Sequence, residues 1–108
     1  MLNSLIKVVL AGVIVATMHP AQADIQAGRQ KAQMCATCHG PLGVATMPNT
    51  PNLAAQPELY LSEQLKAYRS GKRTHDIMTL IAKPLTDDEI ASLSLWFSSL
   101  QIEVKERP

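Results

Sequence analysis

Apolar residues recur along the chain at helical spacing, and this pattern predicts three helices. The first runs from about residue 25 to residue 37, and small side chains occupy the middle of its narrow apolar face. That face consists of Ile25, Gly28, Ala32 and Cys35. Because its middle is nearly bare, another helix could approach it closely. No run alternates between apolar and polar residues as a strand would, so we expect an all-α fold.

The second predicted helix starts at Pro57 and ends at Gly71. Proline suits the first helical position because it has no amide hydrogen to leave unpaired. Glycine is a common cap at the C-terminal end of a helix. The apolar stripe of this helix consists of Leu61, Leu65 and Tyr68.

The third predicted helix follows Pro84 and has the clearest beginning. Thr86 and Glu89 have the spacing of a capping box, and the acidic residues of this first turn suit the positive end of the helix dipole. Its apolar stripe, flanked by Trp96, consists of Ile90, Leu93, Phe97 and Leu100.

Residues 40–56 contain too many prolines, glycines and small residues for regular structure. A loop of this length is unusual in a small domain unless it wraps a bound group. The tail at 101–108 is charged, and we expect it to be frayed.

The N-terminus has the pattern of a secretory signal peptide, which we expect to span residues 1–23. Lys7 precedes an apolar run, and the small-residue site at 21–23 predicts cleavage after Ala23. The alternative is an uncleaved membrane anchor, but polar residues interrupt the run before it reaches the length of a span. The remaining residues, 24–108, form one small domain of a size at which a bound group often adds needed stability.

Removal of Lys7 with the signal leaves as many basic as acidic residues. A balanced charge argues against nucleic-acid binding, which requires a concentrated basic excess.

The chemistry of the chain centres on Cys35-Ala36-Thr37-Cys38-His39, which is the sequence form of covalent c-type haem attachment. Helical spacing places both thiols on one face, where they can add to the two vinyl groups of a porphyrin. The imidazole of His39 can then bind the iron. A redox disulfide and part of a zinc site are the alternatives, but His19 and His75 are poorly placed to complete a zinc site.

The order of these motifs, together with Pro51-Asn52-Leu53 and the methionine near the last helix, resembles the class I c-type cytochromes, in particular the small bacterial monohaem kind of the periplasm. The resemblance covers residues 24–100. It implies a compact class I cytochrome c fold, with three main helices and loops wrapped around one haem c attached through Cys35 and Cys38. The first helix departs from many members because it lacks an aromatic residue.

Family members use a downstream methionine as the second axial ligand, and the resemblance assigns this role to Met78. Met1 and Met18 leave with the signal, Met34 is adjacent to Cys35, and Met47 lies in the loop soon after His39. Simple core packing is the alternative for Met78. His75 is its chemical rival as ligand.

Three further roles follow from the resemblance. The backbone carbonyl of Pro51 is expected to accept the second imidazole N–H of His39, although an ordinary loop proline is the alternative. Arg73 is expected to contact a haem propionate. Gly28 is expected to lie against Trp96 or Phe97 where the first and last helices cross.

Arg73 belongs to the one basic cluster of the chain, which consists of Lys66, Arg69, Lys72 and Arg73. Such a cluster can steer an acidic partner, or it can be a solvated helix end.

With both axial positions filled, the iron has no open site, so we expect an electron carrier rather than an enzyme. The expected protein is a periplasmic monomer that carries single electrons between protein redox partners, with no stable membrane insertion after cleavage. The alternatives are a tightly bound cytochrome subunit of a larger periplasmic oxidoreductase, a haem sensor in which Met78 is displaced, and a haem-free thiol oxidoreductase.

Overall fold

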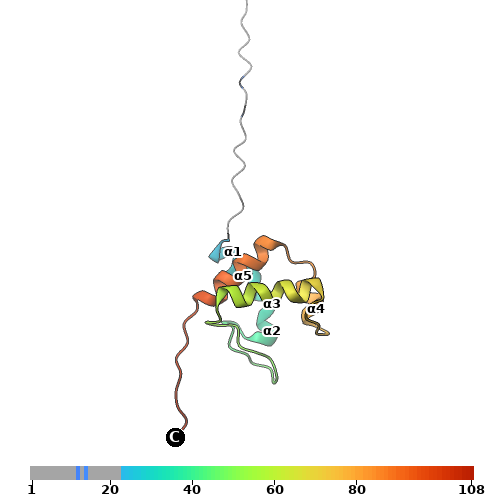
Figure 1. Cartoon of the computed structure of the whole chain (residues 1–108). Coiled ribbons are helices and arrows are strands. Elements are labelled where there is room, and N and C mark those ends of the chain that lie inside the picture. Colours follow the sequence, from blue (N-terminus) through green and yellow to red (C-terminus); the bar gives the residue numbers. More distant parts are fainter. Residues whose placement is uncertain (1–11, 13, 15–22) are drawn as a thin grey trace, which may run out of the picture.

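The computed structural model describes residues 12, 14 and 23–108, and all regular structure among them is helical (Figure 1). This confirms the predicted all-α fold. The predicted signal peptide and its cleavage site lie almost entirely outside the described residues. Within the described part, no helix is long and apolar enough to cross a membrane.

The N-terminal helical segment is longer and less regular than the sequence predicted. It begins with α1 (Ile25–Lys31), continues as the 3₁₀ helix η1 (Ala32–Cys35) and ends with α2 (Ala36–His39). The predicted boundary at residue 37 was therefore two residues short. A 3₁₀ turn has three residues rather than 3.6, so it rotates the face that carries the cysteines relative to the face of α1.

The second predicted helix is α3 (Glu58–Ser70), and its end at Gly71 is as expected. Gly71 has a φ of 83°, in the left-handed region that glycine adopts readily. Pro57 is the N-cap and not the first helical residue, because its ψ of 136° is extended. The prediction placed it one position too far inside the helix.

The third predicted helix is α5 (Asp87–Ser99), and both bonds of its capping box are present. The Glu89 amide donates to Thr86 Oγ1 at 3.1 Å, and the Thr86 amide donates to Glu89 Oε2 at 3.0 Å.

A short helix, α4 (Met78–Ala82), was not predicted. Its five residues are too few for an apolar stripe to repeat, so periodicity gives no signal there. Met78 is its first residue.

The core lies where α5 packs against both α1 and α3, while α4 packs on α3 (Figure 1). The predicted stripes of α3 and α5 face this core: Ile90, Leu93 and Phe97 are buried, as are Leu61 and Tyr68. Leu65, Trp96 and Leu100 are partly buried against it.

The crossing of α1 and α5 depends on Gly28. A Cβ atom at this position would lie 1.9 Å from the backbone oxygen of Ser92 and 3.0 Å from the Cβ of Trp96. The predicted contact with Trp96 is therefore present. Phe97, the other predicted partner, instead lies against Gly43, where an added Cβ would be 2.9 Å from its ring. A single turn of α5 thus holds both the first helix and the loop after α2.

Candidate functional site

The two cysteines lie at the junction of η1 and α2, and both are free thiols that are half-buried. Burial, followed by the nearby Cys38, raises the pKa of the Cys35 thiol to about 11, although Lys31 opposes this shift. Thiolate is the reactive form of cysteine, so a thiol with this pKa is a poor nucleophile at neutral pH.

His39 ends α2 and is buried, with 7% of its surface exposed. Its Nδ1 lies 2.7 Å from the carbonyl oxygen of Pro51, so the hydrogen bond predicted between these residues is present. A carbonyl only accepts hydrogen bonds, so the proton of the neutral ring must lie on Nδ1. Nε2 then keeps its lone pair, which is the form of imidazole that binds a metal.

The carbonyl of Pro51 is held in place by the bonds of its own loop. The amides of Leu53 and Ala54 donate to the Gly43 oxygen at 2.7 and 3.0 Å. The amide of Ala55 donates to the oxygen of Phe97 at 2.9 Å, which ties the loop to the end of α5. The loop at 40–56 lacks regular structure, as predicted, but these bonds anchor it to the core.

Met78 is half-buried at the edge of the core and begins α4. Large apolar side chains close to the two candidate ligands in the sequence are exposed: Leu42 and Val44 follow His39, and Ile77 precedes Met78. A porphyrin plane requires apolar side chains of this kind around it.

His75 is exposed, and its ring contacts the backbone of its own turn. Nδ1 accepts hydrogen bonds from the amides of Ile77 and Met78, each at 3.2 Å. Sequence reasoning considered His75 only as a ligand or a surface residue and missed this contact. The signal available was the position of the histidine three residues before the start of a short helix.

Arg73 is exposed and held by two side chains of α3. Its Nη1 donates to Gln64 Oε1 at 2.7 Å, and its guanidinium lies 4.7 Å from the centre of the Tyr68 ring. Arg69, from the same basic cluster, donates to the Leu85 oxygen at 2.9 Å and to Asp87 Oδ1 at 2.6 Å. Arg69 therefore joins α3 to the start of α5.

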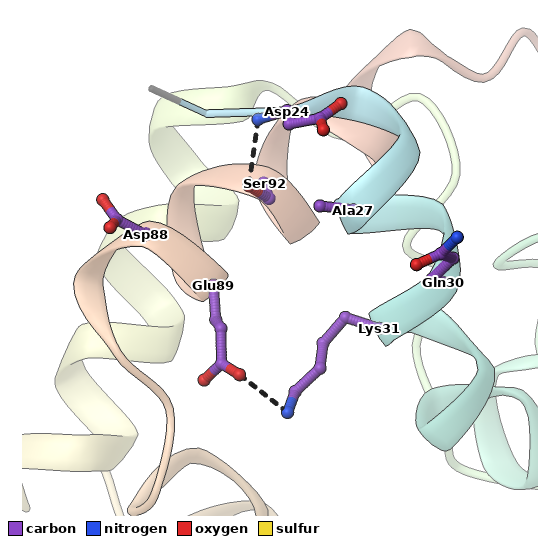
Figure 2. Close-up of a pocket in the computed structure, with 7 residues that line it drawn as sticks. All are labelled: Asp24, Ala27, Gln30, Lys31, Asp88, Glu89 and Ser92. Carbon is purple, nitrogen blue, oxygen red and sulfur yellow. Dashed lines mark hydrogen bonds and ion pairs between the residues drawn. The ribbon is translucent and has the colours of Figure 1, made fainter. Parts of the chain in front are cut away.

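The described residues form a pocket away from the cysteines, His39 and Met78, between α1 and α5 (Figure 2). Across it, Lys31 Nζ pairs with Glu89 Oε1 at 2.9 Å, and the amide of Asp24 donates to Ser92 Oγ at 3.0 Å. Figure 2 shows these two contacts bridging the helices at different places along the crossing. The pocket is thus an opening beside the helix crossing that Gly28 makes possible.

Comparison with known proteins identifies relatives of the whole helical part. Residues 25–101 match the family described as "Cytochrome c". The chain is 39% identical to cytochrome c4 of Pseudomonas aeruginosa over 78% of its own length and 42% of that protein. It is also 39% identical to cytochrome c-554(548) of Halomonas halodenitrificans, over 70% of its own length and 95% of that protein.

A third relative is a "Thiosulfate dehydrogenase electron acceptor" from Thiomonas intermedia, which is 31% identical over 94% of this chain and 48% of that protein. The solved structure of Acidithiobacillus ferrooxidans cytochrome c4 matches with a TM-score of 0.67 and 27% identity, over 79% of this chain and 58% of that one. The chain thus spans about half the length of several relatives and nearly all of another.

The residues of the site fit haem c. Two thiols separated by two residues provide its covalent attachment, and the histidine that follows presents a buried ring whose Nε2 keeps a lone pair. This local chemistry agrees with the match across residues 25–101. The chain belongs to the cytochrome c family and is a class I c-type cytochrome of the bacterial kind.

Proposed function

We propose that this protein is a monohaem electron carrier whose haem c is attached through Cys35 and Cys38 and ligated by His39 and Met78. The observation that carries the proposal is the bond of 2.7 Å between His39 Nδ1 and the Pro51 oxygen, because it leaves Nε2 as the metal-binding atom. The bound haem would supply a reversible one-electron change at its iron.

The residues of the chain would orient the ligands and adjust the reduction potential of the haem. Pro51 orients the His39 ring and makes it a more basic ligand. The thioether of Met78 would favour ferrous iron and so raise the reduction potential relative to a second imidazole. If His39 and Met78 both held the iron, a substrate would have no open position there, which favours electron transfer over catalysis.

Arg73 is the proposed partner of a haem propionate. Its guanidinium already binds the amide oxygen of Gln64 and packs on Tyr68, so it is held at one end of α3. A carboxylate is a stronger acceptor for a guanidinium than an amide oxygen is, so a propionate within reach would compete with Gln64.

The proposed partners are redox proteins of the periplasm, reached after cleavage of residues 1–23. The Thiomonas relative is named as an electron acceptor of thiosulfate dehydrogenase. A dehydrogenase of this class is therefore the first electron donor to test with the purified protein.

The proposal is tested by spectroscopy of protein purified from cells that mature c-type cytochromes. Alkaline pyridine should give a haem c spectrum, and the ferric protein should show the weak near-infrared band of sulfur ligation. Met78→Ala should lose this band and bind carbon monoxide in its ferrous form. Met47→Ala, which alters another methionine that is 46% exposed, is the matched control and should keep the band.

A band that survives in Met78→Ala would contradict the ligand assignment, and protein without haem would contradict the whole proposal.

A further inference from the structure

The helix that carries Met78 has an unusual beginning. The N-cap residue Ile77 makes no side-chain capping bond, although the first amides of any helix need partners outside it. Helices as short as α4 are unstable alone, since even alanine-rich peptides need about 12 residues to become helical. The conformation of Met78 therefore depends on contacts from outside α4.

His75 supplies these contacts. Its ring Nδ1 accepts from the amides of Ile77 and Met78 at 3.2 Å each. Its own amide donates to Thr79 Oγ1 at 2.9 Å, and its carbonyl accepts from the Thr79 amide at 3.0 Å. One residue thus makes four hydrogen bonds to the three residues around the start of α4.

These bonds determine which nitrogen of the ring carries the proton. A backbone N–H can only donate, so Nδ1 must hold a lone pair, and the proton of the neutral ring lies on Nε2. Neither nitrogen is then free for iron, because Nδ1 is engaged by the backbone and Nε2 has no lone pair. His39 shows the opposite arrangement, with its proton on Nδ1.

We propose that His75 is a positioning residue, which caps α4 and thereby holds Met78 in place for the haem iron, and is not a rival ligand. The inference rests on the proposed function, because it takes Met78 as the sulfur ligand. Because α4 has only five residues and packs mainly on α3, the cap is a main restraint on the Met78 backbone. Its loss should let Met78 leave the iron more often.

The experiment measures how tightly added imidazole binds the ferric holoprotein, because imidazole can bind only when the sulfur has left. His75→Ala removes the acceptor and should raise imidazole affinity about tenfold, the effect of losing roughly one net hydrogen bond. His75→Asn keeps a short side-chain acceptor and should stay within about twofold of the wild type. Thr74→Ala, an exposed neighbour, is the matched control and should bind imidazole as the wild type does.

Two further measurements keep the inference testable should His75→Ala fail to fold. Thr79→Val removes the hydroxyl that accepts from the His75 amide and should raise imidazole affinity about threefold, as expected for a weaker bond. Nitrogen NMR of the ferrous protein should show the proton of His75 on Nε2. A proton on Nδ1, an unchanged affinity in His75→Ala, or a wild-type spectrum of two imidazole ligands that His75→Ala abolishes would each overturn the inference.

The failure of the proposed function has a different signature. If Met78 is not the ligand, Met78→Ala leaves the near-infrared spectrum and imidazole affinity unchanged. The NMR spectrum would still report whether His75 caps α4. The cap and the ligand assignment can therefore fail independently.

Discussion

The two proposed ligands, His39 and Met78, are held by regions of different construction. His39 is buried, bonded to Pro51, and followed by a loop that is anchored to α5. Met78 is half-buried and begins a helix of five residues that packs on α3 and is capped by a local histidine. The position of His39, on the imidazole side of the site, thus depends on the core. The position of Met78, on the sulfur side, depends mainly on local hydrogen bonds. Local opening of a short helix requires less free energy than unfolding of the core does. We therefore expect the sulfur of Met78 to dissociate from the iron before the imidazole of His39.

The largest expected effect comes from the crossing of α1 and α5. Gly28→Ala would place a Cβ against the backbone of Ser92, which cannot move without separating the helices. We expect a loss of about 3 kcal/mol in the free energy of unfolding, measured with guanidinium. Gly71→Ala is the control, because its φ of 83° is strained but open space surrounds it, and it should cost about 1 kcal/mol. Equal losses would show that the crossing is not tight.

Gly43→Ala tests whether the imidazole side depends on the core. An added Cβ would lie 2.8 Å from the amide nitrogen of Ala54 and 2.9 Å from the Phe97 ring, at a φ of 74°. We expect about 2 kcal/mol of destabilisation and a weaker His39 to Pro51 bond. The shift of the His39 Nδ1 proton in the NMR spectrum of the ferrous protein measures that bond. If the variant lost stability without any change in this signal, the His39 to Pro51 bond would not depend on core packing. The proposed difference between the His39 and Met78 regions would then be wrong.

Thr86→Ala tests the capping box of α5, which makes no bond to α4 or to either ligand. Loss of the threonine oxygen should cost about 1 kcal/mol, while Thr86→Ser should cost much less. Imidazole affinity should remain that of the wild type, because α4 does not use this cap. An affinity that rises as much as in His75→Ala would show that general stability, and not the local cap, holds the sulfur in place.

The smallest expected effect concerns acid. The hydrogen bond and charge of Arg69 lower the pKa of Asp87, and a hydrogen bond from Lys31 is the main cause of the lowered pKa of Glu89. A carboxyl whose pKa is lower in the folded state stabilises the protein above its unfolded pKa, and this contribution is lost as the pH falls through the folded pKa. Stability should therefore decrease as the pH falls below about 4.

Asp87→Asn should reduce this acid-dependent loss slightly, because the pair is exposed and salt screens it. Asp88→Asn removes a charge from the same turn and is the matched control for net charge. Thermal unfolding between pH 3 and pH 6 would measure both. If the two variants had the same acid dependence, the Arg69 pair would make no specific contribution.

Much of the fold was predictable because its signals are local. The capping box at Thr86, the glycine cap at Gly71 and the apolar stripes of α3 and α5 each depend on residues within a few positions of one another. The attachment motif at 35–39 is equally local. Errors arose where the local signal was weak: Pro57 was displaced by one residue, and the 3₁₀ turn η1 and the helix α4 have no sequence pattern of their own.

By itself, the sequence determined the chemistry available to this protein: two thiols, a following histidine, and a methionine before the last helix. Only the tertiary structure decided that Phe97 packs on Gly43 while Trp96 lies at Gly28, and that the Ala55 amide donates to the Phe97 oxygen. The physical reason is the distance along the sequence between the residues that interact. Residue type and short-range spacing specify helix ends and reactive groups, whereas the partner of a side chain depends on how distant segments fill space together.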